Sequence, residues 1–312
     1  MTSWLKLKTG AALASRFNTA VKPQVLTSDL RAKLSSVRVA NSDANLRNFP
    51  DFLILGPQRT GTTWLFHNLK SHPEIFLPKE KELYYFSTLG APNHRRFRFP
   101  YLEGYLHAMT DSPRSKLKRH YDSLRKVGRL YHPSIRGEAT ASYAALPKEV
   151  IRDIATLNPE IKAILMIRDP IDRAWSHARK DLLTAGRPAD DLDPDALSRL
   201  LFKDEQRELA LYRTLIENWR SHLQPGHLFV GVFDSIASDP ERLLAALHGF
   251  LGVASGKRYF GRLLRHRINP APPATIPPEI GNRVREMLRH ECEDYGQLQK
   301  EITASGQVFR CY

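Results

Sequence analysis

The stretch Phe52-Leu53-Ile54-Leu55-Gly56-Pro57-Gln58-Arg59-Thr60-Gly61-Thr62-Thr63-Trp64-Leu65-Phe66 decides the fold. The apolar run at its start is typical of a short strand that is buried on both faces. The glycines and the proline then favour a tight loop, and the apolar residues from Trp64 onward begin a helical pattern. A strand, a tight loop and a helix in this order form the unit from which parallel sheets are built.

The rest of the chain continues this alternation. Buried-strand patterns occur at 75–77, 161–167 and 228–233, and helical patterns at 171–183, 194–223, 240–250 and 279–302. Asp239 before Pro240, and Gly252 just beyond, mark the two ends of one of these helices. We therefore expect an α/β fold with a P-loop-like central parallel sheet, flanked by helices on both faces, in a single domain at 49–312.

The loop at 56–63 has groups that suit an anion. In open α/β sheets, ligands bind beyond the carboxyl ends of the strands, and backbone N–H groups at a helix N-terminus attract negative charge. Gly56 and Gly61 allow close approach of the backbone, and Thr62 and Thr63 add hydroxyl donors. Taken alone, the loop is also compatible with a purely structural turn.

Two known loops have similar spacing. Gly56 and Gly61 match the glycines of the nucleoside-triphosphate P-loop, but Thr62 occupies the position where that loop has lysine. The segment Arg59-Thr60-Gly61-Thr62-Thr63-Trp64 instead resembles the 5′-phosphosulfate-binding loop of sulfotransferases that use 3′-phosphoadenosine-5′-phosphosulfate (PAPS). The usual form of that loop is Pro-Lys-Ser-Gly-Thr-Thr-Trp, so Arg59 replaces its lysine.

A second motif resembles the same family. The segment Ile164-Leu165-Met166-Ile167-Arg168-Asp169-Pro170-Ile171-Asp172-Arg173-Ala174-Trp175-Ser176 is similar to its 3′-phosphate-binding segment. Arg168 at the end of a buried strand would supply a guanidinium that can bind phosphate with two hydrogen bonds. Ser176 on the next helix would supply an uncharged hydrogen-bond donor. Alone, the motif also fits an ordinary helix start with a surface ion pair. After the loop at 56–63, it points to a PAPS-dependent sulfotransferase.

Weaker resemblances add further site residues. Glu138-Ala139-Thr140-Ala141-Ser142-Tyr143 resembles the segment that lines the acceptor cleft of the carbohydrate branch, which implies that Glu138, Thr140 and Tyr143 bind the acceptor. Gly256-Lys257-Arg258 resembles the loop that folds over the nucleotide. Phe233-Asp234-Ser235 resembles a structural segment after a strand. Trp64 fits either stacking on adenine or a place in the core.

The resemblance also implies a mechanism. A sulfuryl group would pass from PAPS to a hydroxyl or amine by in-line displacement, leaving 3′-phosphoadenosine-5′-phosphate (PAP), with no metal. Arg59 would stabilise the leaving phosphate rather than donate a proton, because a guanidinium stays charged. Lys81-Glu82-Leu83-Tyr84-Tyr85-Phe86 resembles the Lys-Glu-x-x-Phe-Phe pattern of the glycosaminoglycan-type branch, which makes Glu82 the candidate base and Glu80 its competitor.

The acceptor and the branch follow from the same pattern. The cytosolic small-molecule branch uses a histidine base, for which this sequence has no convincing counterpart. A saccharide or glycolipid acceptor is therefore favoured, without excluding hydrophobic small molecules or peptide tyrosines.

The composition narrows the classes of partner. The 312 residues have a formal charge of +14, which favours anions such as nucleic acid, anionic membrane or an anionic substrate. Because no recognition helix, zinc-ligand pattern or aromatic RNA-binding strand is apparent, we expect no nucleic acid. Residues 88–136 form a basic insertion beside the site or a solvated basic face. The sparse cysteines, Cys292 and Cys311, favour a reducing compartment and so the cytoplasm.

The first 48 residues are expected to be a partly ordered lead-in or a targeting segment. Lys6, Lys8, Arg16 and Lys22 precede the first acid, Asp29, which also suits an amphipathic helix that contacts a membrane surface or an organellar transit peptide. No apolar run of about 18 residues predicts a membrane span.

Two other functions compete with this interpretation. A P-loop kinase would depend on Mg²⁺ and on a lysine next to Ser or Thr, which Thr62 contradicts. A non-catalytic module that binds anionic glycans or membranes would bind in a salt-sensitive way without turnover.

Overall fold

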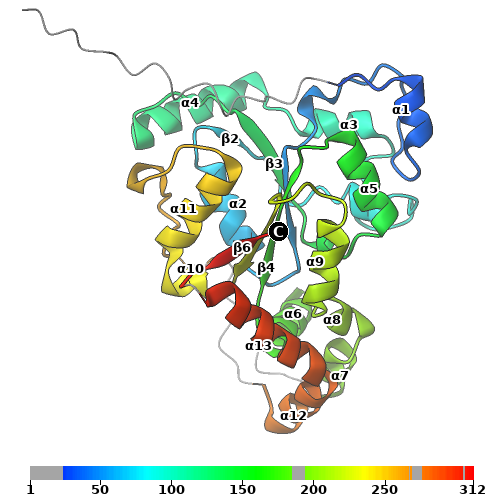
Figure 1. Ribbon diagram of the computed structural model, residues 1–312, viewed down its shortest axis with the longest axis vertical. Helices are drawn as coiled ribbons and strands as arrows, with labels where there is room; N and C mark the ends of the chain where they lie inside the picture. The colour runs from blue at the N-terminus through cyan, green and yellow to red at the C-terminus, as the bar shows by residue number, and fades with distance from the viewer. Residues whose placement is uncertain (1–23, 185–193, 267, 269–275, 305) are drawn as a thin grey trace, which may run out of the picture.

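A six-stranded sheet with the order β2-β3-β1-β4-β5-β6 forms the centre of the computed structural model (Figure 1). The structure describes residues 24–184, 194–266, 268, 276–304 and 306–312. The neighbours from β2 to β5 pair in parallel, and β6 is antiparallel to β5. The strands are β1 Phe52–Gly56, β2 Ile75–Phe76, β3 Ile135–Ala139, β4 Lys162–Ile167, β5 Leu228–Val232 and β6 Phe309–Cys311.

Helices connect these strands. The α-helices are α1 Ser28–Lys33, α2 Thr62–Lys70, α3 Leu102–Ala108, α4 Pro113–Val127, α5 Lys148–Leu157, α6 Pro170–Thr184, α7 Pro194–Leu201, α8 Asp204–Glu208, α9 Tyr212–Arg220, α10 Ser235–Ser238, α11 Pro240–Leu251, α12 Pro278–Met287 and α13 Arg289–Thr303. Short 3₁₀ helices are η1 Leu46–Asn48, η2 Phe86–Thr88, η3 Ala141–Ala145 and η4 Lys257–Tyr259.

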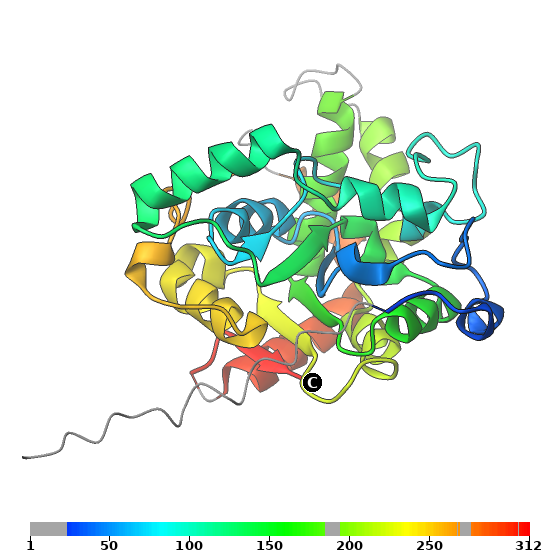
Figure 2. The same cartoon turned by 90° about the horizontal axis from the view of Figure 1, so that it is seen from above.

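The two faces of the sheet bury different apolar clusters. Leu53 and Leu165 pack on the side of α5, α9 and α13, whereas Ile54 and Ile164 pack on the side of α2 and α11. Side chains alternate between the faces of a strand, so an uninterrupted apolar run is needed when both faces are covered. Figures 1 and 2 show helices on both sides of the sheet. The predicted fold class is therefore confirmed.

Two predicted helices are wrong in extent. The pattern at 194–223 is divided into α7, α8 and α9, and the pattern at 279–302 into α12 and α13. The first division occurs because its two ends pack against different neighbours: Leu197 lies in a cluster with α6 and α12, while Trp219 packs on the sheet. The apolar periodicity of the sequence continues through the point where the packing neighbours change. No Gly or Pro marks the break between the helices.

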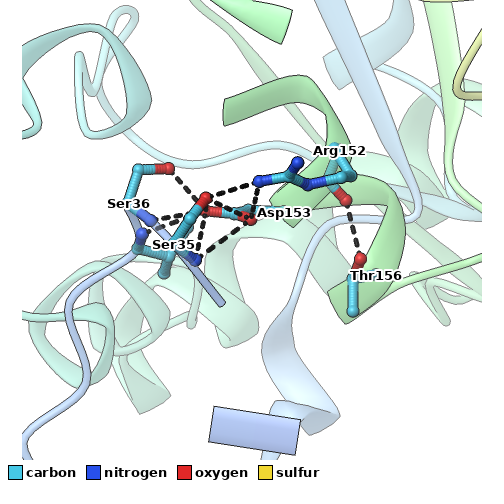
Figure 3. A network of polar contacts seen from close by, with 6 residues as sticks. Ser35, Ser36, Arg152, Asp153 and Thr156 are labelled. Carbon is cyan, nitrogen blue, oxygen red and sulfur yellow. Dashed lines mark hydrogen bonds and ion pairs between the residues drawn. The ribbon is translucent and has the colours of Figure 1, made fainter. Parts of the chain in front are cut away.

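Residues 35–37, in the segment before β1, bond to α5. Asp153 on α5 is fully buried and accepts hydrogen bonds from the Ser36 hydroxyl at 2.5 Å and the Ser36 backbone N–H at 2.7 Å. Arg152 donates to the Ser35 hydroxyl at 2.7 Å (Figure 3). The basic residues Lys6, Lys8, Arg16 and Lys22 lie outside the described residues. Within the described chain, no helix is long and apolar enough to cross a membrane.

Asp153→Ala is expected to lower the free energy of unfolding by about 2–3 kcal/mol, because several donors lose a charged acceptor. Burial raises the pKa of Asp153, but the hydrogen bonds from Ser36 and Ser35 outweigh it and the net pKa is lowered. A lowered pKa stabilises the fold above the pKa of the unfolded aspartate, so this contribution is lost as the pH falls below about 4. Urea unfolding at pH 7 and pH 3 measures both effects. Thr156→Ala, on the exposed side of the same helix, serves as the control and should change stability by less than about 0.5 kcal/mol.

Candidate active site

The loop after β1 turns on two glycines. Gly56 has a φ of +103°, and a Cβ at this position would lie 2.2 Å from the backbone oxygen of Ala141. Gly61 has a φ of +90°, and its Cβ would lie 2.4 Å from Cδ1 of Ile236. Both positions therefore need glycine for backbone conformation and for space. The loop is held closely between η3 on one side and the β5–α10 connection on the other.

The loop delivers an uncapped helix N-terminus. Gly61 is the N-cap of α2 and supplies no side-chain acceptor. The Thr60 hydroxyl, which is buried, donates to the Pro57 oxygen at 2.7 Å and braces the loop from inside. The first backbone bond runs from the Leu65 N–H to the Gly61 oxygen at 3.1 Å. The N–H groups at 62–64 therefore precede that bond and are suited to an anion.

Three elements bring Arg59, Arg168 and Ser176 together. Arg59 in the loop donates from Nε to the Ser176 hydroxyl on α6 at 2.8 Å. Arg168, at the end of β4, donates from Nη1 to the Arg59 backbone oxygen at 3.0 Å. Its guanidinium also lies 4.4 Å from the ring centroid of Phe233, just after β5. The two predicted phosphate motifs thus meet at the carboxyl edge of the sheet.

This cluster has an excess of positive charge. Burial lowers the pKa of Arg59, and the guanidinium groups of Arg168 and Arg179 lower it further. In the described part of the chain, neither Arg59, Arg168 nor Arg179 forms an ion pair with a carboxylate. Nε of Arg168 and Nη2 of Arg179 are buried without a hydrogen-bond partner. Arg179 is buried and Arg59 and Arg168 are half-buried. Because burial weakens the hydration of a cation, the cluster fits an anionic ligand.

Arg179 was not predicted from the sequence. It lies on α6, one helical turn after Ser176, with its guanidinium 5.7 Å from the ring of Trp175. The i, i+3 spacing from Ser176 is the signal that places both side chains on one helical face. Without knowledge of the Arg59 position, that spacing does not reveal a site.

The predicted nucleotide-covering residues lie on the α2 and α11 side. Trp64 is only 3% exposed, packs in the core cluster of that face, and donates from Nε1 to the Leu264 oxygen at 2.9 Å. This bond ties the segment after η4 to the start of α2. Gly256 precedes η4, and Lys257 and Arg258 are exposed on it beside α4. These three residues form no hydrogen bond with the loop at 56–63 within the described chain.

Glu82 lies next to the start of the loop. Its Oε1 accepts from the Ala141 N–H at 3.3 Å and pairs with Nζ of Lys81 at 2.9 Å. The Tyr84 hydroxyl donates to Oε2. Because Ala141 also contacts Gly56, the carboxylate and the anion loop share one neighbour. Glu80, in contrast, is exposed and paired with Arg98 at 2.6 Å.

Glu82 is held ionised. Burial raises its pKa, but the charge of Lys81 and the hydrogen bonds from Tyr84, Lys81 and Ala141 outweigh burial, so the net pKa is lowered. Its side chain retains 17% exposure. A carboxylate that is charged at neutral pH and still reachable can accept a proton.

The three predicted acceptor residues are inside the protein. Glu138, Thr140 and Tyr143 are at most 1% exposed, so their side chains offer no surface to an acceptor in this structure. They hold the segment that contains Glu82 instead. The Thr140 hydroxyl accepts a hydrogen bond from the Leu83 N–H at 3.0 Å and donates one to Glu138 at 2.5 Å. The Tyr143 hydroxyl accepts a hydrogen bond from the Phe86 N–H at 3.2 Å. Burial raises the pKa of Glu138 to about 7. These residues therefore position the segment at 82–86.

The fold and the site together define a class of protein. A mostly parallel sheet, a glycine loop after β1, an uncapped helix N-terminus and a cluster of partly buried arginines form a site for a ligand with phosphate groups. The site has the backbone of a P-loop but has an arginine cluster in place of the P-loop lysine.

A sequence model of the sulfotransferase family matches residues 50–255, and the chain belongs to this family. The matched segment includes the loop, Glu82, Arg168 and Ser176.

Curated relatives carry sulfotransferase names. The membrane-associated sulfotransferase kil1 of Dictyostelium discoideum is 30% identical over 134 residues, which cover 43% of this chain and 23% of the relative. The bifunctional heparan sulfate N-deacetylase/N-sulfotransferase 4 of Mus musculus is 25% identical, over 68% of this chain and 23% of the relative. Carbohydrate sulfotransferase 15 of Mus musculus is 26% identical, over 60% of this chain and 37% of the relative. The match thus spans well under half the length of these relatives.

A solved structure agrees with the fold. The sulfotransferase from Alicyclobacillus acidocaldarius superimposes with a TM-score of 0.51 at 22% identity, covering 81% of this chain and 95% of the other. At this identity the likeness establishes the shared architecture.

Proposed function

We propose that the protein transfers a sulfuryl group from PAPS to a hydroxyl or amine of a polar acceptor, which is a saccharide or glycolipid. One observation carries this proposal. An ionised carboxylate, Glu82, and an arginine cluster around Arg59 both border the loop after β1: Ala141 contacts Glu82 and Gly56, and Arg59 follows Gly56 by three residues. A proton acceptor next to a phosphate site is the pair of groups that group transfer to a hydroxyl needs.

The donor fits the charges of the site. PAPS has a 5′-phosphosulfate and a 3′-phosphate on one ribose, and the site has two adjoining cations, Arg59 and Arg168. The loop at 56–63, with Gly56, Thr60, Gly61, Thr62 and Thr63, would hold the 5′-phosphosulfate. The unpartnered Nε of Arg168 and the Ser176 hydroxyl would hold the 3′-phosphate. We assign Gly256, Lys257 and Arg258 to the rim of the nucleotide site, and Trp64, which packs in the core, to the support of the helix start beneath it.

The chemistry follows from these positions. A bond forms between the acceptor oxygen or nitrogen and sulfur, while the bond from sulfur to the bridging phosphate oxygen breaks. Glu82 takes the proton of the acceptor. Negative charge grows on the leaving phosphate of PAP, where Arg59 and the first N–H groups of α2 stabilise it. By analogy with phosphoryl transfer, position and charge supply most of the catalysis.

Two observations favour a saccharide acceptor. Glu82 lies in the Lys-Glu-x-x-Phe-Phe-like pattern of the glycosaminoglycan-type branch. The relatives include proteins named for heparan sulfate and carbohydrate sulfation. We also propose a reducing compartment, the cytoplasm, because Cys292 and Cys311 are both free thiols. The proposed membrane contact of the N-terminal segment falls on residues outside the described chain.

The direct test is a transfer screen. Purified protein is incubated with isotope-labelled PAPS and a panel of saccharides, glycolipids, phenols and tyrosine peptides, and products are identified by mass. Sulfated saccharide or glycolipid supports the proposal. Turnover of ATP–Mg²⁺ with no sulfuryl transfer would favour a kinase, and salt-sensitive glycan binding with no transfer to any acceptor would favour a binding module.

Arg168→Ala is expected to weaken PAP binding by about 10- to 100-fold, because a charge-assisted hydrogen bond to phosphate is lost. Arg168→Lys should recover only part of the affinity, since an ammonium has no forked donor. Isothermal calorimetry measures the affinity, and thermal unfolding without ligand checks that the variants fold. Arg213→Ala removes a surface arginine on α9 and should leave PAP affinity unchanged. Equal PAP affinity of wild type and Arg168→Ala contradicts the 3′-phosphate assignment.

A further inference from the structure

Helix α4 has an exposed apolar stripe. Leu117 is 71% exposed, Tyr121 64% and Leu124 49%. Their i, i+4, i+7 spacing places them on one face of the helix. Leu130, which follows the helix, is 61% exposed. Scattered apolar residues on a surface are ordinary, but a row along one helix marks a contact face.

A row of cations lies beside this stripe. Lys118 and Arg125 each follow a residue of the apolar row, and Arg114 lies one turn before Lys118 on the same face. They are exposed, as are Lys116 and Lys126. None of these five residues forms an ion pair within the described chain. Asp122 is the one acid of the helix.

The rest of α4 is anchored to the protein. Ser123 is buried and donates to the Arg129 oxygen at 2.6 Å. Arg119 donates to the Leu77 oxygen at 2.7 Å and pairs with Asp111 at 3.1 Å. Figures 1 and 2 both show α4 on the outside of the molecule. The apolar and basic rows therefore point outward from a helix that the fold holds in place.

We propose that α4 lies on an anionic lipid surface and acts as a peripheral membrane anchor. A helix of low overall hydrophobicity, with Leu and Tyr along one row and Lys and Arg along the next, inserts its apolar row at the headgroup boundary while its cations meet anionic lipids. The charge complementarity identifies the partner. A sulfated polysaccharide would use the cations but gains nothing from Leu117 and Leu124. A second copy of this chain would bring the same unpaired cations face to face.

The basic surface continues beyond the helix. η4 contacts α4, and its Lys257 and Arg258 are exposed. The proposed membrane face therefore adjoins the segment that Trp64 ties to α2. This inference rests on surface chemistry alone and does not depend on the proposed sulfuryl transfer.

Vesicle flotation of the full chain tests the proposal. The vesicles contain phosphatidylcholine with about 30% phosphatidylserine, or phosphatidylcholine alone. We expect flotation with the anionic vesicles only, and loss of binding at high salt. Reversal of two cations, Lys118→Glu with Arg125→Glu, should weaken binding by at least about tenfold. Replacement of the apolar row, Leu117→Ser with Tyr121→Ser and Leu124→Ser, should weaken it comparably.

The matched control is Lys148→Glu with Lys300→Glu. It changes the net charge by the same amount on α5 and α13, where both residues are exposed, and should leave flotation unchanged. Circular dichroism confirms that each variant is folded. Three results would each overturn the proposal: flotation that survives the serine substitutions, binding to heparin beads without vesicle binding, and a dimer that the serine substitutions dissociate while vesicles stay unbound.

Discussion

Glu82→Gln is expected to lower the turnover number by about 10²- to 10⁴-fold, the usual contribution of a positioned general base. Glutamine keeps the size and most hydrogen bonds of the side chain but cannot take the acceptor proton. Because the Glu82 carboxylate contacts Lys81, Tyr84 and Ala141 rather than the arginine cluster, PAP affinity should remain within about threefold of wild type. Single-turnover transfer from labelled PAPS and calorimetry with PAP measure the two quantities separately.

The control and the pH profile make this test specific. Glu80→Gln alters the neighbouring carboxylate, which is paired with Arg98 in solvent, and should retain turnover. Since the pKa of Glu82 is lowered, kcat/KM should fall only at pH values below the ordinary glutamate range. Tyr84→Phe removes a hydrogen bond that lowers this pKa, so the acidic limb should move to higher pH. Full turnover in Glu82→Gln would eliminate Glu82 as the base.

Arg59→Ala is expected to lower turnover by about 10²- to 10³-fold, comparable to the loss of one preorganised group that stabilises transition-state charge. The effect arises because Arg59 is the one loop side chain that is fully charged, and its Nε is oriented by Ser176 at 2.8 Å. Charge on the leaving phosphate is greatest in the transition state, so kcat should fall more than PAP affinity does.

Arg59→Lys separates charge from proton donation. If Arg59 acts by charge, lysine should restore turnover to within about tenfold of wild type. Because lysine can lose its proton at high pH and arginine cannot, turnover should fall at high pH only in the lysine variant. Rapid-quench kinetics with labelled PAPS give kcat, and calorimetry gives the affinity for PAP. An Arg59→Ala variant with unchanged kcat and a raised KM would show that Arg59 only holds the donor.

Much of the fold can be predicted from local sequence patterns. The apolar runs of β1, β4 and β5 predict buried strands, and Asp239, Pro240 and Gly252 mark the limits of α11. β3 was not predicted, because Ile135-Arg136-Gly137-Glu138-Ala139 lacks an apolar run, although β1 and β2 flank it. The limits of α7 and α9 depend on which neighbours they pack against.

The sequence alone determined that the glycine loop at 56–63 and Arg168 lie at one edge of the sheet. Both follow buried strands, and parallel strands align their carboxyl ends. Only the tertiary structure distinguished Glu82 from Glu80, buried Glu138, Thr140 and Tyr143, and added Arg179. Those outcomes depend on contacts between residues far apart in the chain, and solvent exposure is a property of such contacts rather than of local residue patterns.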